Sequence, residues 1–148
     1  MPSEQQTEIY RQHRTVQDKY IYFLLAAAGA AIAFAVNQTQ DAKLAWSQLP
    51  LACAVAFWAL SFFCGCRHLG YIESTLLAND ALLRVIAGRD PQIGMHPQLI
   101  NVASEGIQKA IEVNSKWAGR FARWQFRCLV LGAASYLMWH VVEMWLRS

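Results

Sequence analysis

Charged side chains are absent from two long stretches of this chain, Tyr20 to Val36 and Leu49 to Cys66. A third apolar stretch, Cys128 to Leu146, lies near the other end. As a helix with its flanking turn, each stretch is long enough to cross the roughly 30 Å hydrocarbon core of a bilayer. The missing charge therefore predicts an all-α integral membrane protein with three transmembrane helices.

The sequence also lacks the motifs of the common enzyme classes. No Walker loop, Rossmann fingerprint, nucleophile elbow, HExxH helix or paired CxxC occurs. Arg89 and His96 have a spacing that some ribonuclease motifs allow, but Pro91, Gly94 and Pro97 place this pair in a turn. We expect a protein that is not an enzyme and that uses no cofactor.

Cysteine is scarce, and all four cysteines lie inside or at the edge of the apolar stretches: Cys53, Cys64, Cys66 and Cys128. Thiols in such places behave as small hydrophobic groups, so no disulfide framework is predicted. The run from Cys64 to His68 suggests a metal site. However, residues two apart on a helix point in different directions, so Cys64 and Cys66 cannot both reach one ion. Helix packing around Gly65 is the favoured explanation, and no metal site is expected.

Lysine and arginine are distributed unevenly. They number three before the first apolar stretch, one between the first two, eight between the second and third, and one after the third. Because Lys and Arg favour the cytoplasmic side, this bias predicts a multi-pass protein of the cell inner membrane, with its N-terminus in the cytoplasm and its C-terminus outside. The aromatic residues agree, with Tyr20, Tyr22 and Trp124 at proposed inner boundaries and Trp46 and Trp145 at outer ones.

The first stretch has an alternative interpretation as a signal peptide. Ala33-Phe34-Ala35 follows an apolar core, as a cleavage site would. The segment before it carries Glu4, Glu8 and Asp18 among its basic residues, which disfavours that interpretation. We therefore treat the first stretch as a span.

Three spans leave little chain for a second folded domain. We expect one helical membrane domain over residues 1–148, with spans at about 20–36, 49–66 and 128–146 and a cytoplasmic hairpin at about 67–127. The second span continues as a helix to about Gly88, a turn follows, and helix resumes at about Pro97. The hairpin is thus formed by extensions of the second and third spans.

Apolar residues spaced three and four apart predict the inner seam of this hairpin. One arm contributes Leu69, Ile72, Leu76, Asn79, Leu83 and Ile86, and the other contributes Ile100, Ala103, Ile107, Ala110, Asn114, Trp117, Phe121 and Trp124. Asn79 and Asn114 either set the register of a coiled-coil assembly or hydrogen-bond across the hairpin. Trp117 and Trp124 would hold the arms apart near the membrane, so the bundle could surround a vestibule.

Small residues dominate the first span, where pairs such as Ala26 with Ala30 allow close helix packing in lipid. This surface serves either the neighbouring spans or another copy of the chain. We therefore expect two partners, the lipid bilayer and other copies of the same chain in a homo-oligomer.

The third span carries a candidate intramembrane polar face: Gly132, Ser135, Tyr136, His140 and Glu143. Polar groups inside a membrane often mark ion or proton paths, and His140 and Glu143 could share a proton there. Alternatively, Glu143 lies near the outer surface, reaches water and caps His140. Neither residue indicates an enzyme.

A basic and aromatic group precedes the third span. Arg120, Arg123 and Arg127 alternate with aromatic residues, which suits contact with anionic headgroups of the inner leaflet. The other bases of the hairpin are interspersed with acidic residues, as on an ordinary solvated helix face. No nucleic-acid partner is expected.

Gln17-Asp18-Lys19 directly before the small-residue span, a second span after a short loop, a helical cytoplasmic segment and a C-terminal span give the chain a familiar layout. It resembles small bacterial transmembrane effectors of antiphage defence, such as the Pycsar transmembrane family. The resemblance covers the whole chain as layout and Asp18 and Lys19 as residues. It implies spans that permeabilise the membrane when the cytoplasmic part senses a nucleotide signal or a protein partner, although no separate nucleotide-binding domain is present.

Two functions of different classes follow. The first is an oligomeric inner-membrane pore or gated channel controlled through the cytoplasmic hairpin. The second is a membrane anchor or adaptor whose hairpin docks a soluble partner. A holin-like lysis protein has a similar number of spans, but the predicted orientation and the large hairpin suit it less well.

Overall fold

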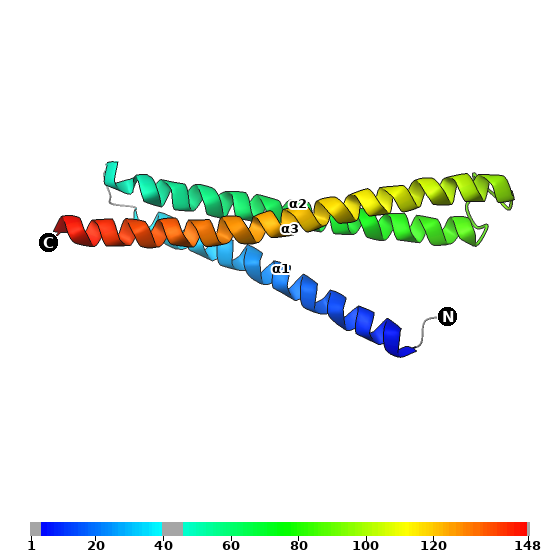
Figure 1. The fold of residues 1–148 in the computed structure, drawn as a ribbon, viewed down its shortest axis with the longest axis horizontal. Coiled ribbons are helices and arrows are strands. Elements are labelled where there is room, and N and C mark those ends of the chain that lie inside the picture. Colours follow the sequence, from blue (N-terminus) through cyan, green and yellow to red (C-terminus); the bar gives the residue numbers. More distant parts are fainter. Residues whose placement is uncertain (1–3, 40–45, 148) are drawn as a thin grey trace. The chain divides into compact units, whose positions relative to one another are not determined.

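The computed structural model describes residues 4–39 and 46–147, and within them the side chains except those of residues 4–7, 9–14, 17, 18, 47 and 147. Four elements follow one another (Figure 1): α1 (Glu4–Gln38), the short 3-10 helix η1 (Trp46–Gln48), α2 (Leu49–Ile86) and α3 (Pro97–Arg147). The loop expected outside the membrane, around Asp41 and Lys43, and the side chain of Asp18 lie outside the described part.

The all-helical prediction is confirmed, and each of the three long helices is long and apolar enough to span a membrane. At 1.5 Å per residue, the 38 residues of α2 extend about 57 Å and the 51 residues of α3 about 77 Å. Both helices therefore exceed the roughly 30 Å of a hydrocarbon core. Each must extend beyond any bilayer that it crosses.

The chain divides into two compact units. The three-helix unit comprises Met1–Gly65 and Arg123–Ser148, and the hairpin unit comprises Cys66–Ala122. Helices α2 and α3 contribute to both units. The hairpin unit corresponds closely to the segment that the sequence predicts as a hairpin.

A glycine-dependent turn closes the hairpin unit. Gly88 has a φ of 65°, and its amide donates to the carbonyl of Val85 while the amide of Arg89 donates to the carbonyl of Arg84. These two bonds form a Schellman motif, which satisfies carbonyls at the end of α2. After the turn, the backbone carbonyl of His96 accepts a hydrogen bond from the amide of Ile100. Pro97 takes the first helical position of α3, where its missing N–H costs nothing.

Replacing Gly88 with alanine should destabilise the hairpin by roughly 1–2 kcal/mol, because a side chain disfavours this left-handed conformation. The added Cβ would also lie 3.2 Å from Cγ of Met95. Gly70→Ala is the matched control, since nothing lies within 4 Å of its Cβ position in α2. Unfolding followed by circular dichroism in detergent measures both variants. Equal midpoints for the two variants would contradict the assignment of the turn.

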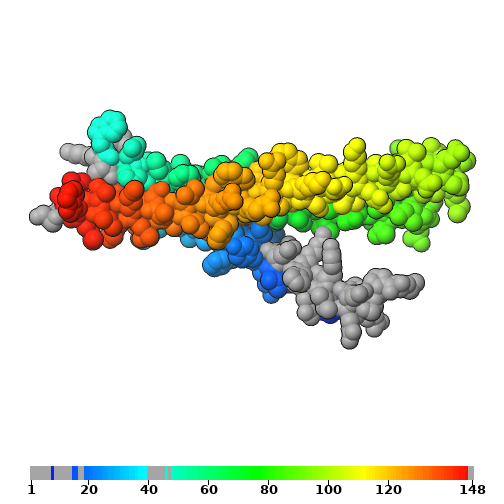
Figure 2. Space-filling model, in the orientation of Figure 1, coloured from blue at the N-terminus to red at the C-terminus, as the bar shows by residue number. Residues whose placement is uncertain are grey.

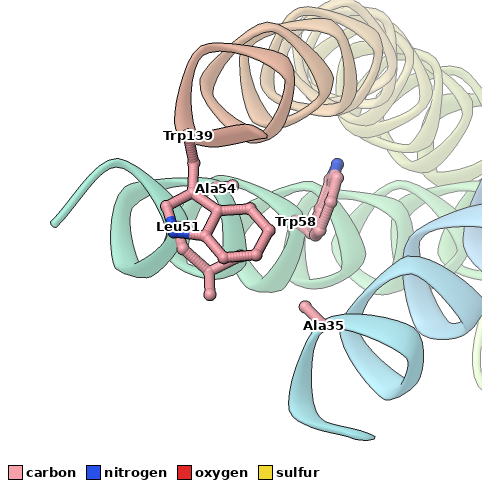
Figure 3. Close-up of a cluster of buried hydrophobic side chains, with 5 residues drawn as sticks. All are labelled: Ala35, Leu51, Ala54, Trp58 and Trp139. Atoms are coloured by element: carbon pink, nitrogen blue, oxygen red, sulfur yellow. The ribbon is translucent and has the colours of Figure 1, made fainter. Parts of the chain in front are cut away.

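The core of the three-helix unit is a cluster from all three helices. Ala35 of α1, Leu51, Ala54 and Trp58 of α2, and Trp139 of α3 are buried together. Figure 3 shows the Trp139 ring reaching from α3 towards Leu51 on α2, with Ala35 on the facing side of α1. Small residues let the helix backbones approach, and the two indoles fill the remaining space. The three apolar segments thus form one packed bundle.

The seam of the hairpin unit differs in phase from the predicted one. Thr75, Val85 and Ala118 are buried, whereas Leu76 and Leu83 are exposed. Nδ1 of His68 donates to the carbonyl of Ala118 at 2.8 Å, which fixes the level at which the two arms meet. Val85 and the smaller or polar residues His68, Thr75 and Ala118 therefore lie between the arms, and much of the predicted leucine seam lies on the outside.

Candidate functional site

A layer of small and polar groups lies inside the three-helix unit. Oγ of Ser61 on α2 donates to the backbone carbonyl of Gln125 on α3 at 2.8 Å, and both residues are completely buried. Cys64 and Cys128 are buried in the same unit. Gly65 provides the close approach, since a Cβ there would lie 2.6 Å from Nε2 of Gln125. This polar layer is therefore tightly packed.

Gln125 is the unusual member of the layer. Both polar atoms of its side chain, Nε2 and Oε1, are buried and have no hydrogen-bond partner among the residues that the structure describes. Leaving such groups unpaired costs about 1–3 kcal/mol each in protein interiors. In helices long and apolar enough to span a membrane, an unpaired polar group of this kind makes Gln125 a candidate functional residue.

The predicted polar face of α3 is only partly assembled. Gly132 is buried against Trp58, and the hydroxyl of Tyr136 donates to Oε1 of Gln38 at 2.7 Å. Ser135 and Glu143 are half-buried, whereas His140 is exposed. Trp139, one residue before it, takes the inward position instead. The structure thus brings Gly132 and Tyr136 to the bundle interior and leaves His140 on its outside.

The residues predicted to set assembly and register lie outside the observed seam or at its margin. Asn79 is exposed and Asn114 is half-buried. Trp117 and Trp124 are exposed, and Ala118 and Gln125 occupy the inward positions next to them. The tryptophans therefore do not lie between the helices as wedges, which was the reason to expect a splayed bundle around a vestibule.

The basic residues are arranged on aromatic rings. Within the hairpin unit, the guanidinium of Arg67 lies 5.2 Å from the ring centre of Tyr71, and that of Arg120 lies 5.0 Å from Trp117. Tyr71 also stacks on Phe121, with ring centres 5.6 Å apart. Arg–aromatic groups of this kind are common at the membrane–water boundary.

The three predicted inner-leaflet arginines, Arg120, Arg123 and Arg127, are all exposed. In the three-helix unit, the guanidinium of Arg127 lies 5.8 Å from the ring centre of Trp124. Exposure leaves their charges available to anionic groups. Contact with headgroups remains a prediction.

The cysteines are separated by the helix geometry as expected, with Cys64 buried and Cys66 exposed. Cys53 and Cys128 are also free thiols. Among the residues that the structure describes, no three His, Cys, Asp or Glu side chains gather where they could hold one ion.

A groove of about 660 Å³ opens between the end of α1 and the start of α2 in the three-helix unit. Its lining is mostly apolar and rich in small residues, including Ala52, Ala56 and Ala59. Such a surface suits a hydrocarbon chain or another helix.

Sequence reasoning missed Ser61, Gln125 and Tyr71. Gln125 interrupts the apolar pattern one position after Trp124, and that interruption was the available signal. Comparison of the chain with family models, with curated proteins and with solved structures finds no match.

Proposed function

We propose that several copies of this chain assemble in a membrane and form a gated passage, with the hairpin unit as the control element. The observation that carries the proposal is the buried, unpaired amide of Gln125. A second packing of the helices that exposed this amide to water or to another copy would recover its lost hydrogen bonds. The described packing then corresponds to a closed state, and Gln125 favours opening.

The orientation is part of this proposal. The excess of Lys and Arg between the second and third apolar stretches supports a hairpin in the cytoplasm, with the C-terminus outside. The layout resemblance to transmembrane antiphage effectors supports a nucleotide signal or a protein at the hairpin as the trigger. Permeabilisation of the inner membrane would then be the response.

Conductance measurements on the full chain in planar bilayers test this function. We expect discrete conductance steps from the unaltered protein. Gln125→Met removes the amide that favours opening, so the open probability should fall about tenfold if the closed state gains about 1.4 kcal/mol. Gln108→Met is the control, because Gln108 is exposed on the same helix. A complete absence of conductance, or equal effects of the two variants, would contradict the proposal.

The second candidate function is a membrane anchor that docks a soluble protein. Exposed apolar side chains on the hairpin unit, such as Leu83 and Val102, favour it. Under this alternative, the purified protein carries a bound partner and gives no conductance. The bilayer experiment therefore separates the two functions.

A further inference from the structure

The α2 arm of the hairpin unit carries an apolar stripe that the hairpin itself does not cover. Leu76, Leu83 and Ile86 are exposed, Leu83 to 68%, and Leu69 and Ile72 on the same stripe are half-buried. Their spacing of three, four or seven residues keeps them on one side of the helix. These five residues form the α2 stripe.

The α3 arm carries a second stripe of different character. Its large members, Leu99, Val113 and Trp117, are exposed, and between them lie the small residues Ala103, Gly106 and Ala110. A Cβ added at Gly106 would meet nothing within 4 Å, so the middle of this α3 stripe is open. The α3 stripe therefore has small side chains in its middle, where the α2 stripe has its leucines.

The remaining faces of both arms have the character of water-exposed helices. Asp80 pairs with Arg84 at 2.9 Å and Glu112 pairs with Lys116 at 2.7 Å, and all four side chains are well exposed. The hydrogen bond from Lys116 and its charge hold the pKa of the Glu112 carboxyl below its usual range. Apolar stripes beside such charges lie in or near water, and covering their exposed leucines removes apolar surface from that water.

The two stripes lie on opposite sides of the hairpin. On a helical wheel of 100° per residue, the α3 stripe falls on the side where Tyr71 stacks with Trp117 and Phe121. The α2 stripe falls well away from Tyr71 on the wheel of α2, towards the other side. Figure 2 shows the green α2 arm and the yellow α3 arm packed along each other. Because the two stripes fall on opposite sides of this pair on the helical wheels, neither can cover its counterpart in the same copy.

We propose that the α2 stripe of one copy packs against the α3 stripe of the next copy. This rests on the proposed function, because copies inserted in one membrane share one height. The bond between His68 and Ala118 sets the levels of the two arms. Equal steps from this pair towards the turn bring Leu76 level with Ala110 and Leu83 level with Ala103, so large residues meet small ones.

The dimensions explain why this contact needs the membrane. The residues 69–86 form a strip about 26 Å long and about 10 Å wide, or roughly 260 Å² in projection. A stable dimer in solution buries about 800 Å² per partner. Spans that hold the copies in one plane raise their effective concentration and compensate for the small seam. Because the two stripes differ, the contact is head-to-tail and can close into a ring.

Disulfide trapping of the full chain in native membranes tests the contact. The exposed Cys53 and Cys66 are first replaced with serine. Leu83→Cys and Ala103→Cys are then made singly and together, and mild copper-phenanthroline oxidation is followed by non-reducing electrophoresis. The double variant should give a ladder of covalent oligomers, and a mixture of the two single variants should give a covalent dimer. Leu76→Cys with Ala110→Cys is an independent second pair.

The outcomes separate the contact from the function. Neither single variant alone should cross-link, whereas dimers of Leu83→Cys alone would indicate a symmetric contact and overturn the proposal. Absence of cross-links from both pairs would also overturn the proposal. A different protein that covers the stripes would give this result. A ladder without conductance would support the contact and contradict the passage. Conductance without a ladder would do the reverse.

Discussion

Gly132→Ala is expected to destabilise the protein by about 1–3 kcal/mol, the usual cost of overpacking a core. The new Cβ would lie 2.5 Å from both Cδ1 and Nε1 of Trp58 and 3.1 Å from the carbonyl oxygen of Ala54. Neither neighbour can move easily. Trp58 belongs to the buried cluster, and its ring centre lies 5.8 Å from that of Tyr136. The oxygen of Ala54 is part of the backbone of α2. The free energy of unfolding in detergent measures the effect.

Gly119→Ala on the same helix is the control. Nothing lies within 4 Å of its Cβ position, so alanine should stabilise α3 there by about 0.5–1 kcal/mol. The two substitutions are chemically identical and should have opposite signs. A smaller side chain at Trp58, as in Trp58→Phe, should recover part of the loss at Gly132. Equal effects at Gly132 and Gly119 would show that α2 and α3 do not meet at this level.

Gln125→Met should stabilise the three-helix unit by about 1–3 kcal/mol, because it replaces two unpaired buried polar atoms with apolar ones of similar shape. The bond from Ser61 is retained, since its acceptor is the backbone carbonyl of residue 125. Thermal unfolding in detergent provides the measurement, with the exposed Gln108→Met as control.

A loss of stability in Gln125→Met would mean that the amide is satisfied in the folded protein, so that it does not favour opening. A gain in stability together with a lower open probability would link the two properties. Residues that serve a second conformation commonly reduce the stability of the first.

The helices and the turn were predictable because their signals are local. Uncharged stretches indicate helices long enough to span a membrane, and Gly88 and Pro97 mark the end of α2 and the start of α3. Each of these features depends on a few neighbouring residues. Tertiary contacts did not need to be known.

The seam of the hairpin was not predictable in the same way. Each arm has two adjacent stripes of residues spaced three and four apart. The larger apolar residues favour the stripe that does not face the other arm. The observed seam uses His68, Thr75 and Ala118, since small and hydrogen-bonded residues allow the arms to approach. Periodicity alone cannot decide which of two stripes meets the other arm.

The candidate site was predictable only in part, for a related reason. The face containing Gly132 and Tyr136 was identified, but a spacing of four placed His140 on it, whereas Trp139 is the buried residue. Over several turns, a pattern of fours drifts away from the true period of about 3.6 residues. Gln125 was missed because it lies before the predicted third span.

The mass of the full chain in lipid nanodiscs tests the central claim most directly. A passage between copies requires a protein mass that is a multiple of 16.7 kDa, with three or more copies in each disc. We expect one predominant oligomer of this kind, and its mass should not change when the nanodisc sample is diluted. A single protein mass of 16.7 kDa in every disc would contradict the account.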